Sequence, residues 1–274
     1  LEDVLALTGP VTAGGQTFTA ATAIAMLTDT VESAAARATG KPKQVLAELA
    51  PVLLERLMGM VGTGSGKDRL IILDRLLRAL DERDIQFAFQ DDATQAAVVA
   101  AGWAGDIRSA SRDALLVVHT NLGGGKSDAR MREEIAHEAS IHADGSIIDT
   151  VTITRTHLGT PAPATASPSE RLTGLANVDY LRVYVPRGSV LLAAEGFTPP
   201  PEEAFERVSV DALPDRDLLA VEANEIIDPT TGVRMTEEFG RTVFGGWVQI
   251  PAGAQRSVRF SYRLPWQYEV KKSS

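Results

Sequence analysis

The glycine-rich stretch "ALLVVHTNLGGGKSDARM" (residues 114–131) resembles a motif that binds phosphates. It reads as a buried strand, a loop that ends in Gly125, Lys126 and Ser127, and then a helix. A nucleotide-binding P-loop has the same order, but it needs a glycine at the position of Thr120. That glycine lets the loop curl tightly around the phosphates, and threonine resists this backbone geometry. We therefore do not expect an NTPase.

Two uses of this loop remain open. Consecutive glycine N–H groups, a helix N-terminus and one lysine can together hold a phosphate or a carboxylate. The other possibility is a flexible connection between a strand and a helix. We expect the side chain of Asn121 to stabilise the turn. The candidate residues for anion or ligand binding are Asn121, Gly123, Gly124, Gly125, Lys126 and Ser127.

Other candidate motifs fail on their spacing. The stretch "GTGSGK" lacks the glycines that a serine-hydrolase motif needs around Ser65. The stretch "AHEASIH" resembles the zinc motif H-E-x-x-H, but His137 and His142 are one residue too far apart. On a helix they diverge by about 140°, so they cannot share one metal ion. We interpret His119 as a satisfied histidine at a strand end. The sequence thus predicts no metal site, no cofactor and no catalytic set.

The amino-acid composition argues against several classes of protein. The 274 residues carry a formal net charge of −9, which argues against nucleic acid as a partner. The chain has no cysteine, so disulfides and zinc–thiolate sites are excluded. Its apolar runs are too short to span a membrane. Because the chain opens at Leu1 inside an apparent helix, we expect a fragment whose targeting segment lies upstream.

Residues 1–142 are predicted to form a helix-rich, incomplete α/β domain. Helical periodicity predicts helices over 19–40, from Pro42 onward with a kink or break at Pro51, and from Asp68 with Leu70, Leu73, Leu77 and Leu80 on one stripe. A further helix is expected over 92–101, capped by Asp91 or Asp92 and stopped by Gly102. Strands are expected at 85–89 and 114–119, the second in the centre of a sheet, and a last helix at 131–139.

Residues 143–274 change to a period of two, which predicts an antiparallel, Ig-like β-sandwich. Residues Leu181, Val183 and Val185 should face its core, with Tyr180, Arg182 and Tyr184 on the other side. Near the end of the chain Val258, Phe260, Tyr262 and Leu264 should point inward, and Arg259 and Arg263 outward.

Five phrases occur in order along almost the whole chain: "LEDVLALTGPVTAGGQTFTAAT", "LLRALDERDIQFAFQDDATQ", "GWAGDIRSASRDALLVVHTNLGGGKSDARM", "YLRVYVPRGSVL" and "GRTVFGGWVQIPAGAQRSVRFSYRLP". With these the chain resembles the bacterial family called domain of unknown function 4012. The resemblance implies an extracytoplasmic protein of the cell envelope, anchored in the plasma membrane by an upstream helix.

The resemblance leaves two classes of function. The first is a structural module, or one that binds a cell-wall glycan or another partner. The second is part of a phosphotransferase, because the family's N-terminal part is similar in layout to the LytR–CpsA–Psr proteins. Those move glycopolymers from a polyprenyl-pyrophosphate carrier to peptidoglycan, so a polyprenyl-linked phosphate is the second possible ligand. Their catalytic residues match no position in this sequence, and none is carried over. The first class is the one we favour for this chain.

Overall fold

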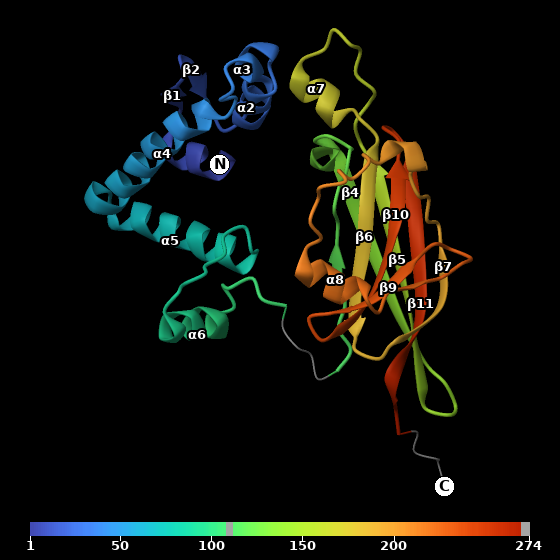
Figure 1. Cartoon of the computed structure of the whole chain (residues 1–274). Helices are drawn as coiled ribbons and strands as arrows, with labels where there is room; N and C mark the ends of the chain where they lie inside the picture. Colours follow the sequence, from blue (N-terminus) through green and yellow to red (C-terminus); the bar gives the residue numbers. More distant parts are fainter. Residues whose placement is uncertain (108–111, 270–274) are drawn as a thin grey trace. The chain divides into compact units, whose positions relative to one another are not determined.

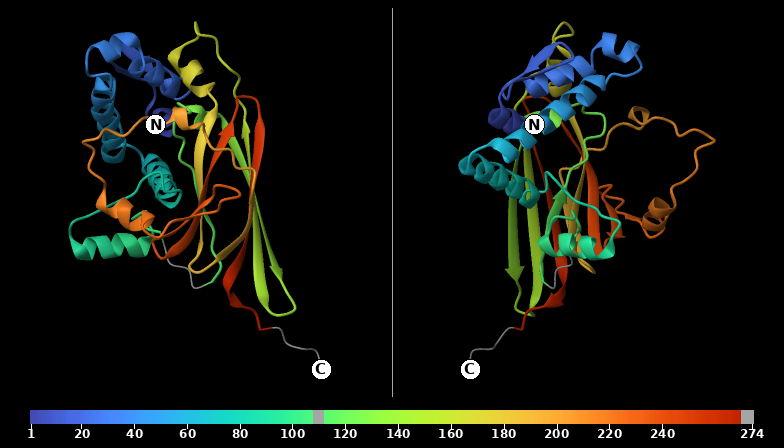
Figure 2. Two further views of the ribbon diagram at one scale, coloured as in Figure 1. Left: turned by 45° about the vertical axis from the view of Figure 1, so that its right-hand side comes forward. Right: turned by 90° about the vertical axis from the view of Figure 1, so that its left-hand side faces the viewer.

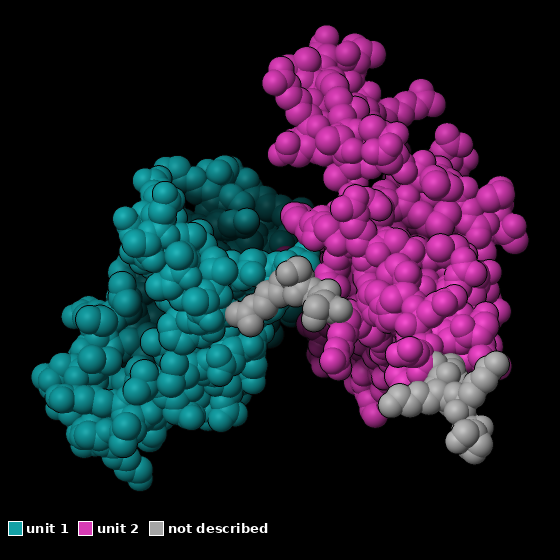
Figure 3. Space-filling view, turned by 90° about the horizontal axis from the view of Figure 1, so that it is seen from below, with its two compact units in different colours: residues 1–108, 167–169 teal, residues 109–166, 170–274 magenta. Residues whose placement is uncertain are grey.

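The computed structural model describes residues 1–107 and 112–269. The chain forms two compact units, one of residues 1–108 with 167–169, the other of residues 109–166 and 170–274 (Figure 3). The boundary therefore falls some thirty residues before the expected division at 142/143. The stretch from 112 to 142, with its glycine-rich loop, belongs to the second unit.

The first unit is helical with one short hairpin (Figure 1). Its helices are α1 (Glu2–Thr8), α2 (Ala23–Val31), α3 (Ala34–Ala38), α4 (Gln44–Thr63), α5 (Gly66–Asp81) and α6 (Asp92–Ala101), and its hairpin joins β1 (Val11–Ala13) to β2 (Gln16–Phe18). A small core packs the hairpin against α1, α2 and α4, with Phe18, Leu27 and Leu49 among its buried side chains. This arrangement is not the α/β layer that we expected.

Several helix predictions need correction. The helix expected over 19–40 is two helices, and the first begins at Ala23 with Thr22 as its N-cap. Helix α4 runs through Pro51 without a break. Helix α5 begins at Gly66 and not at Asp68, and Ser65 caps it: the Ser65 hydroxyl accepts from the Asp68 amide while the Asp68 carboxylate accepts from the Ser65 amide. The prediction for α6 is confirmed, with Asp91 as its N-cap and Gly102 left-handed at its end.

Two apolar patterns in the sequence of the first unit do not correspond to the buried faces that they predict. Of the predicted stripe on α5, Leu80 is buried, but Leu70, Leu73 and Leu77 are exposed. The stretch 85–89 is not a strand, although Ile85 and its two phenylalanines alternate. The amide of Phe87 donates to the carbonyl of Trp103 instead of to a neighbouring strand.

The second unit consists of two antiparallel sheets. One has the order β3 (Leu116–Val118), β6 (Asn177–Pro186), β10 (Arg241–Ile250), β9 (Arg234–Glu238) and β8 (Ile226–Ile227). The other has the order β4 (Met131–Ile141), β5 (Ser146–His157), β11 (Gln255–Gln267) and β7 (Val190–Glu195) (Figure 2). Short helices η1 (Ser127–Arg130), α7 (Pro168–Thr173), η2 (Glu202–Ala204) and α8 (Arg216–Glu222) lie in the connections.

Both sheets contribute to one hydrophobic core. From the five-stranded sheet come Leu181, Val183, Val185 and Phe244, and from the four-stranded sheet Val151, Ile153, Val258, Phe260, Tyr262 and Leu264. The predicted inward faces of 181–185 and 258–264 are confirmed, and Arg259 and Arg263 are exposed as expected. The chain thus combines helices with antiparallel sheets.

Two predictions around the glycine-rich loop are wrong. The strand before the loop is the three-residue β3 at the edge of its sheet, where it pairs only with β6 in the described part of the chain. The stretch after the loop is one turn of 3-10 helix and then strand β4, which pairs along its length with β5. The loop therefore joins two sheets of a β unit, and it does not lead from a central strand into an α-helix.

Candidate functional site

Near the ends of the buried strands, polar residues occupy the inward-facing positions that apolar residues occupy in the middle. On β5 the alternation runs through Asp149, Val151, Ile153, Arg155 and His157, and all five side chains are buried. The middle of β5 contributes apolar side chains to the core. At both ends of the strand, ionisable side chains are buried on the same face. Burying such groups is costly unless they are paired or hydrogen-bonded, so these strand ends are the first places to look for a site.

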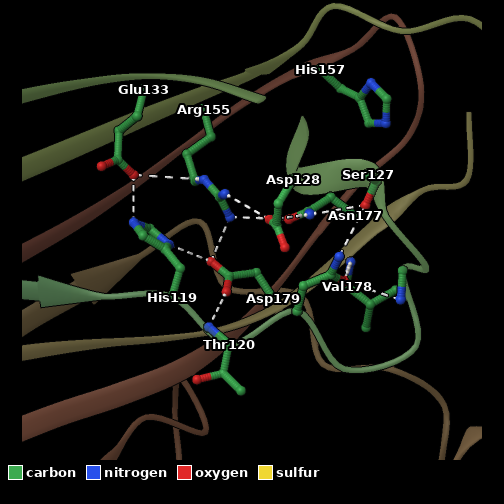
Figure 4. A network of polar contacts seen from close by, with 12 residues as sticks. His119, Thr120, Ser127, Asp128, Glu133, Arg155, His157, Asn177, Val178 and Asp179 are labelled. Atoms are coloured by element: carbon green, nitrogen blue, oxygen red, sulfur yellow. Dashed lines mark hydrogen bonds and ion pairs between the residues drawn. The ribbon is translucent and has the colours of Figure 1, made fainter. Parts of the chain in front are cut away.

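At one end of the sheets the buried carboxylate of Asp179 is the centre of a polar network (Figure 4). Its Oδ1 accepts from the amide of Thr120 at 2.8 Å. Its Oδ2 accepts from Arg155 Nη1 at 2.6 Å and contacts His119 Nδ1 at 2.7 Å. Arg155 also donates to Asn177 Oδ1 at 3.0 Å, so one buried guanidinium joins β5 to β6.

His119 lies between two carboxylates. Its Nδ1 is 2.7 Å from Asp179 Oδ2 and its Nε2 is 2.6 Å from Glu133 Oε2. Both ring nitrogens need a hydrogen to face these acceptors, which only the protonated imidazolium has. Burial alone would lower the pKa of His119, but the contacts with Asp179 and Glu133 outweigh it and raise the pKa to about 9. The Nδ1 of His119 thus has the hydrogen-bond partner expected from the sequence, whereas its Nε2 contacts Glu133 as an ion pair without a hydrogen bond among the described residues.

The side chain of Asn121 organises the glycine-rich loop, as predicted. Its Oδ1 accepts from the amide of Gly124 at 3.0 Å, and its Nδ2 donates to Ser127 Oγ at 3.1 Å. Ser127 is fully buried and also accepts from Asn177 Nδ2 at 3.0 Å. Two of the predicted site residues are therefore joined to the Asp179 network through Asn177.

The glycines of the loop pack closely against the 172–176 segment. A Cβ atom on Gly124 would lie 2.1 Å from Asn121 Oδ1 and 2.8 Å from the carbonyl of Ala176. Gly125 has a left-handed backbone, and a Cβ atom there would meet the carbonyl of Leu172 at 2.9 Å. Gly123 is also left-handed but faces open space. Tight packing thus accounts for two of the three glycines.

Several backbone amides of the loop already donate hydrogen bonds within the protein, so they are not available to an anion. The amides of Leu122, Gly124, Lys126 and Ser127 donate to protein oxygens at 2.7 to 3.1 Å. The helix that follows is a single 3-10 turn, so the dipole of a long helix is absent from the described loop. Lys126 is exposed. Anion binding at these six positions stays a prediction.

A groove lies on the outer face of the five-stranded sheet, on the side away from the shared core. Its volume is about 470 Å³, and its floor is formed by alternate residues of β6, β9 and β10. Helix α8 and the segment before it form one wall. The lining residues are Leu122, Tyr180, Arg182, Phe205, Leu218, Val221, Glu222, Glu225, Arg234, Thr236, Glu238, Val243, Gly245 and Trp247.

Aromatic rings cover the floor of this groove. Tyr180 and Trp247 are cross-strand partners on β6 and β10, and their ring centroids are 5.0 Å apart. Phe205 lies edge-on to Trp247 at 5.5 Å. Gly245, next to them on β10, leaves room for the tyrosine, because a Cβ atom there would lie 2.8 Å from Tyr180 Oη. The result is an amphipathic aromatic surface that solvent can reach.

Charged groups line the groove beside the rings. Glu238 accepts from Tyr184 Oη at 2.8 Å and pairs with Arg182 at 3.4 Å. Burial and this hydrogen bond raise the pKa of Tyr184 above its ordinary range. The Nε of Arg182 is buried without a hydrogen-bond partner among the described residues. Arg234 makes a two-pronged pair with Glu225, with both oxygens at 2.8 Å.

The glycine-rich loop contributes to one edge of this surface. Leu122 lines the groove, and Leu122 and Gly123 line a neighbouring hollow of about 630 Å³. The hollow shares Trp247 and Phe205 with the groove, so the two form one continuous depression. Gln249 on β10 donates to the carbonyls of Thr198 and Pro199, which fixes the segment along its far wall.

Sequence reasoning missed most of these residues, although a signal existed. Arg155 and His157 fall in the same inward phase as Val151 and Ile153, and Asp179 falls in phase with Leu181. A polar residue in phase with a buried strand is a candidate for a network or a site. His137 lies on strand β4, so the prediction of a helix around it is wrong.

Comparisons of the chain with protein-family models, with curated proteins and with solved structures give no match. Within residues 1–107 and 112–269, no helix combines the length and the apolar character needed to cross a membrane. Any assignment of function therefore depends on the site itself and on the family resemblance of the sequence.

Proposed function

We propose that this chain is a glycan-binding module of the bacterial cell envelope, and that the groove on the outer face of the five-stranded sheet holds the glycan. One observation carries the proposal: the half-buried rings of Tyr180 and Trp247 and the exposed ring of Phe205 form one aromatic surface in the groove, with Arg182 and Glu238 at its side. The family resemblance supports the cellular context, an extracytoplasmic domain whose parent protein is anchored in the plasma membrane by an upstream segment.

A sugar ring has two kinds of surface, and the groove offers a partner for each. The C–H groups of a pyranose form an apolar face, which an indole or phenol ring covers well. Its hydroxyls project from the rim, where paired arginine and carboxylate groups donate and accept hydrogen bonds. Three of the lining residues are aromatic and five are charged, so ring faces and charged hydrogen-bonding groups occur side by side in the groove. An extended chain of sugars would suit the continuation of the groove past Phe205 toward Gly123.

The scaffold of this module is, in our proposal, an Ig-like sandwich. Its antiparallel sheets and their shared core support this assignment. The outer face of one sheet is then free to carry the binding surface. In such a module the ionic network at Asp179 serves to fix the β3–β4 loop, and no reaction takes place there.

Binding to isolated peptidoglycan sacculi and to soluble muropeptide and chitin oligosaccharides tests the proposal. We expect the wild-type chain to sediment with sacculi, and Trp247→Ala to reduce this binding at least tenfold, since stacked rings dominate such interfaces. The matched control is Tyr268→Ala, which removes an exposed aromatic ring that lies outside the groove.

Binding by the control should equal that of the wild type, and circular dichroism should show that all three proteins are folded. Equal binding by wild type and Trp247→Ala, or no binding by the wild type to any of these glycans, would refute the proposal. Binding to a polyprenyl phosphate alone, lost in Lys126→Ala, would favour the transferase class instead.

A further inference from the structure

A second polar cluster lies at the other end of the inward-facing strands. His137 on β4 and Asp149 on β5 both belong to the inner face of the four-stranded sheet. Asp113, three residues before the start of β3 at Leu116, reaches the same place. His137 Nε2 is 3.4 Å from Asp149 Oδ2 and 3.7 Å from Asp113 Oδ2. One potential ligand atom from each of the three residues lies within 4.8 Å of the others.

The buried member of this cluster lacks partners. The side chain of Asp149 has no exposed surface, and neither of its carboxylate oxygens makes a hydrogen bond among the described residues. Tyr262, which lies directly across from Asp149 in the β5–β11 register, buries a hydroxyl that also has no partner there. Unpaired buried polar atoms are costly, and a buried carboxylate most of all. Three such atoms in one place indicate a missing ligand.

The distances fit a metal ion better than they fit direct hydrogen bonds. Hydrogen bonds between an imidazole and a carboxylate are about 2.7–3.2 Å long. Ligands at about 2.05 Å from a tetrahedral zinc ion lie about 3.4 Å from one another. The separation of 3.4 Å between His137 and Asp149 equals this second value, and the separation of 3.7 Å between His137 and Asp113 is 0.3 Å longer. His137 and Asp113 are about one-third exposed, so an ion can enter from solvent.

We propose that Asp113, His137 and Asp149 bind a divalent transition metal of the zinc class, with water in the remaining position. One imidazole and two carboxylates suit Zn²⁺, whereas Mg²⁺ and Ca²⁺ prefer sites made of oxygen alone. This site was not predicted from the sequence, because the interpretation of 131–142 as a helix removed His137 from consideration. Its members come from three separate segments of the second unit.

The ion has a structural consequence that follows from the elements it joins. Asp113 precedes the edge strand of the five-stranded sheet, while His137 lies on the edge strand of the four-stranded sheet. At the opposite end of the same two edges, His119 and Glu133 make the corresponding contact as an ion pair. A bound ion would thus link the two sheets at the end where His137 now makes only the long contacts of 3.4 and 3.7 Å, and it should raise the stability of the second unit.

Metal titration of the full chain tests the inference. After treatment with EDTA and its removal, we expect ZnCl₂ to bind one ion per chain and to raise the thermal midpoint, with little effect of MgCl₂ or CaCl₂ at the same concentration. CoCl₂ should give the intense visible absorption of a tetrahedral site. His137→Ala, Asp113→Asn and Asp149→Asn should each weaken zinc binding at least tenfold.

The matched control is His142→Ala, which removes a nearby histidine outside the cluster and should leave binding unchanged. Asp113 is exposed, so its asparagine variant keeps the test valid even if a change at Asp149 disturbs folding. The inference is overturned if zinc does not bind, or if it binds equally to the wild type and to folded Asp113→Asn and His137→Ala. It is also overturned if His142→Ala abolishes binding.

Discussion

Raising the pH should weaken the second unit through a single histidine. His119 contacts carboxylate oxygens with both ring nitrogens, and the groups that face it are Asp179, Glu133 and Arg155. Its pKa of about 9 in the folded protein, against 6.5 in an unfolded chain, corresponds to a ceiling of about 3 kcal/mol of stability. Because the folded pKa is the higher one, this stability is fully present below pH 6.5 and is lost as the pH rises through about 9.

Two measurements check this prediction. An NMR titration of the imidazole signals, assigned with His119→Gln, should show one histidine that loses its proton near pH 9. Urea unfolding of the wild type should then show a lower free energy of unfolding at alkaline pH than at slightly acidic pH. The same comparison in His119→Gln isolates the histidine, since the variant keeps a polar side chain but cannot change its charge. Titration of His119 at or below its ordinary pKa would refute the reasoning, because the two carboxylates would then not be holding a cation.

Three further predictions concern the stability effects of substitutions at buried positions. Phe260→Ala removes a fully buried ring from the shared core and should lower the free energy of unfolding by about 3–5 kcal/mol; an unchanged urea midpoint would contradict this. Gly124→Ala should cost about 1–3 kcal/mol by forcing the side chain of Asn121 away, while Lys126→Ala in the same loop should change stability by less than about 0.5 kcal/mol. Burial and the nearby Asp113 raise the pKa of Asp149, so the folded state is penalised as this carboxyl ionises. In EDTA at neutral pH, Asp149→Asn should therefore unfold at higher urea than the wild type, and a lower midpoint would count against an unpaired carboxylate.

The strands in which apolar and polar residues alternate strictly were predicted correctly. The prediction failed where the spacing of apolar residues fits a helix and a strand equally well. Over 181–185 of β6 and 258–264 of β11 every second residue points inward and is apolar, a pattern that fits a strand and not a helix. Along β4 the apolar residues Met131, Ile135 and Ala139 are four apart, a spacing that places side chains on one face of a helix and of a strand alike. The glutamates and arginine between them favour a helix locally, and pairing with β5 overrides that preference.

The candidate site was predictable only in part, because its residues are brought together by sheet register. Asn121, Gly124 and Ser127 could be selected from the loop sequence itself, since their contacts are local. Asp179 and Arg155 are far from the loop in sequence, and their contact depends on which strands occupy the facing edges of the two sheets. Trp247 and Tyr180 meet for a similar reason, through the pairing of β10 with β6.

The glycine-rich loop connects these two parts of the second unit. On one side Asn121 and Ser127 attach it to the ionic network through Asn177. On the other side Leu122 and Gly123 contribute to the walls of the aromatic depression. Because Gly124 packs against the 172–176 segment, displacement of the network would move the whole loop and with it the edge of the groove. Gly124 and Gly125 then let the backbone pass closely between the network and the proposed binding surface, which a P-loop-like sequence can do without binding a nucleotide.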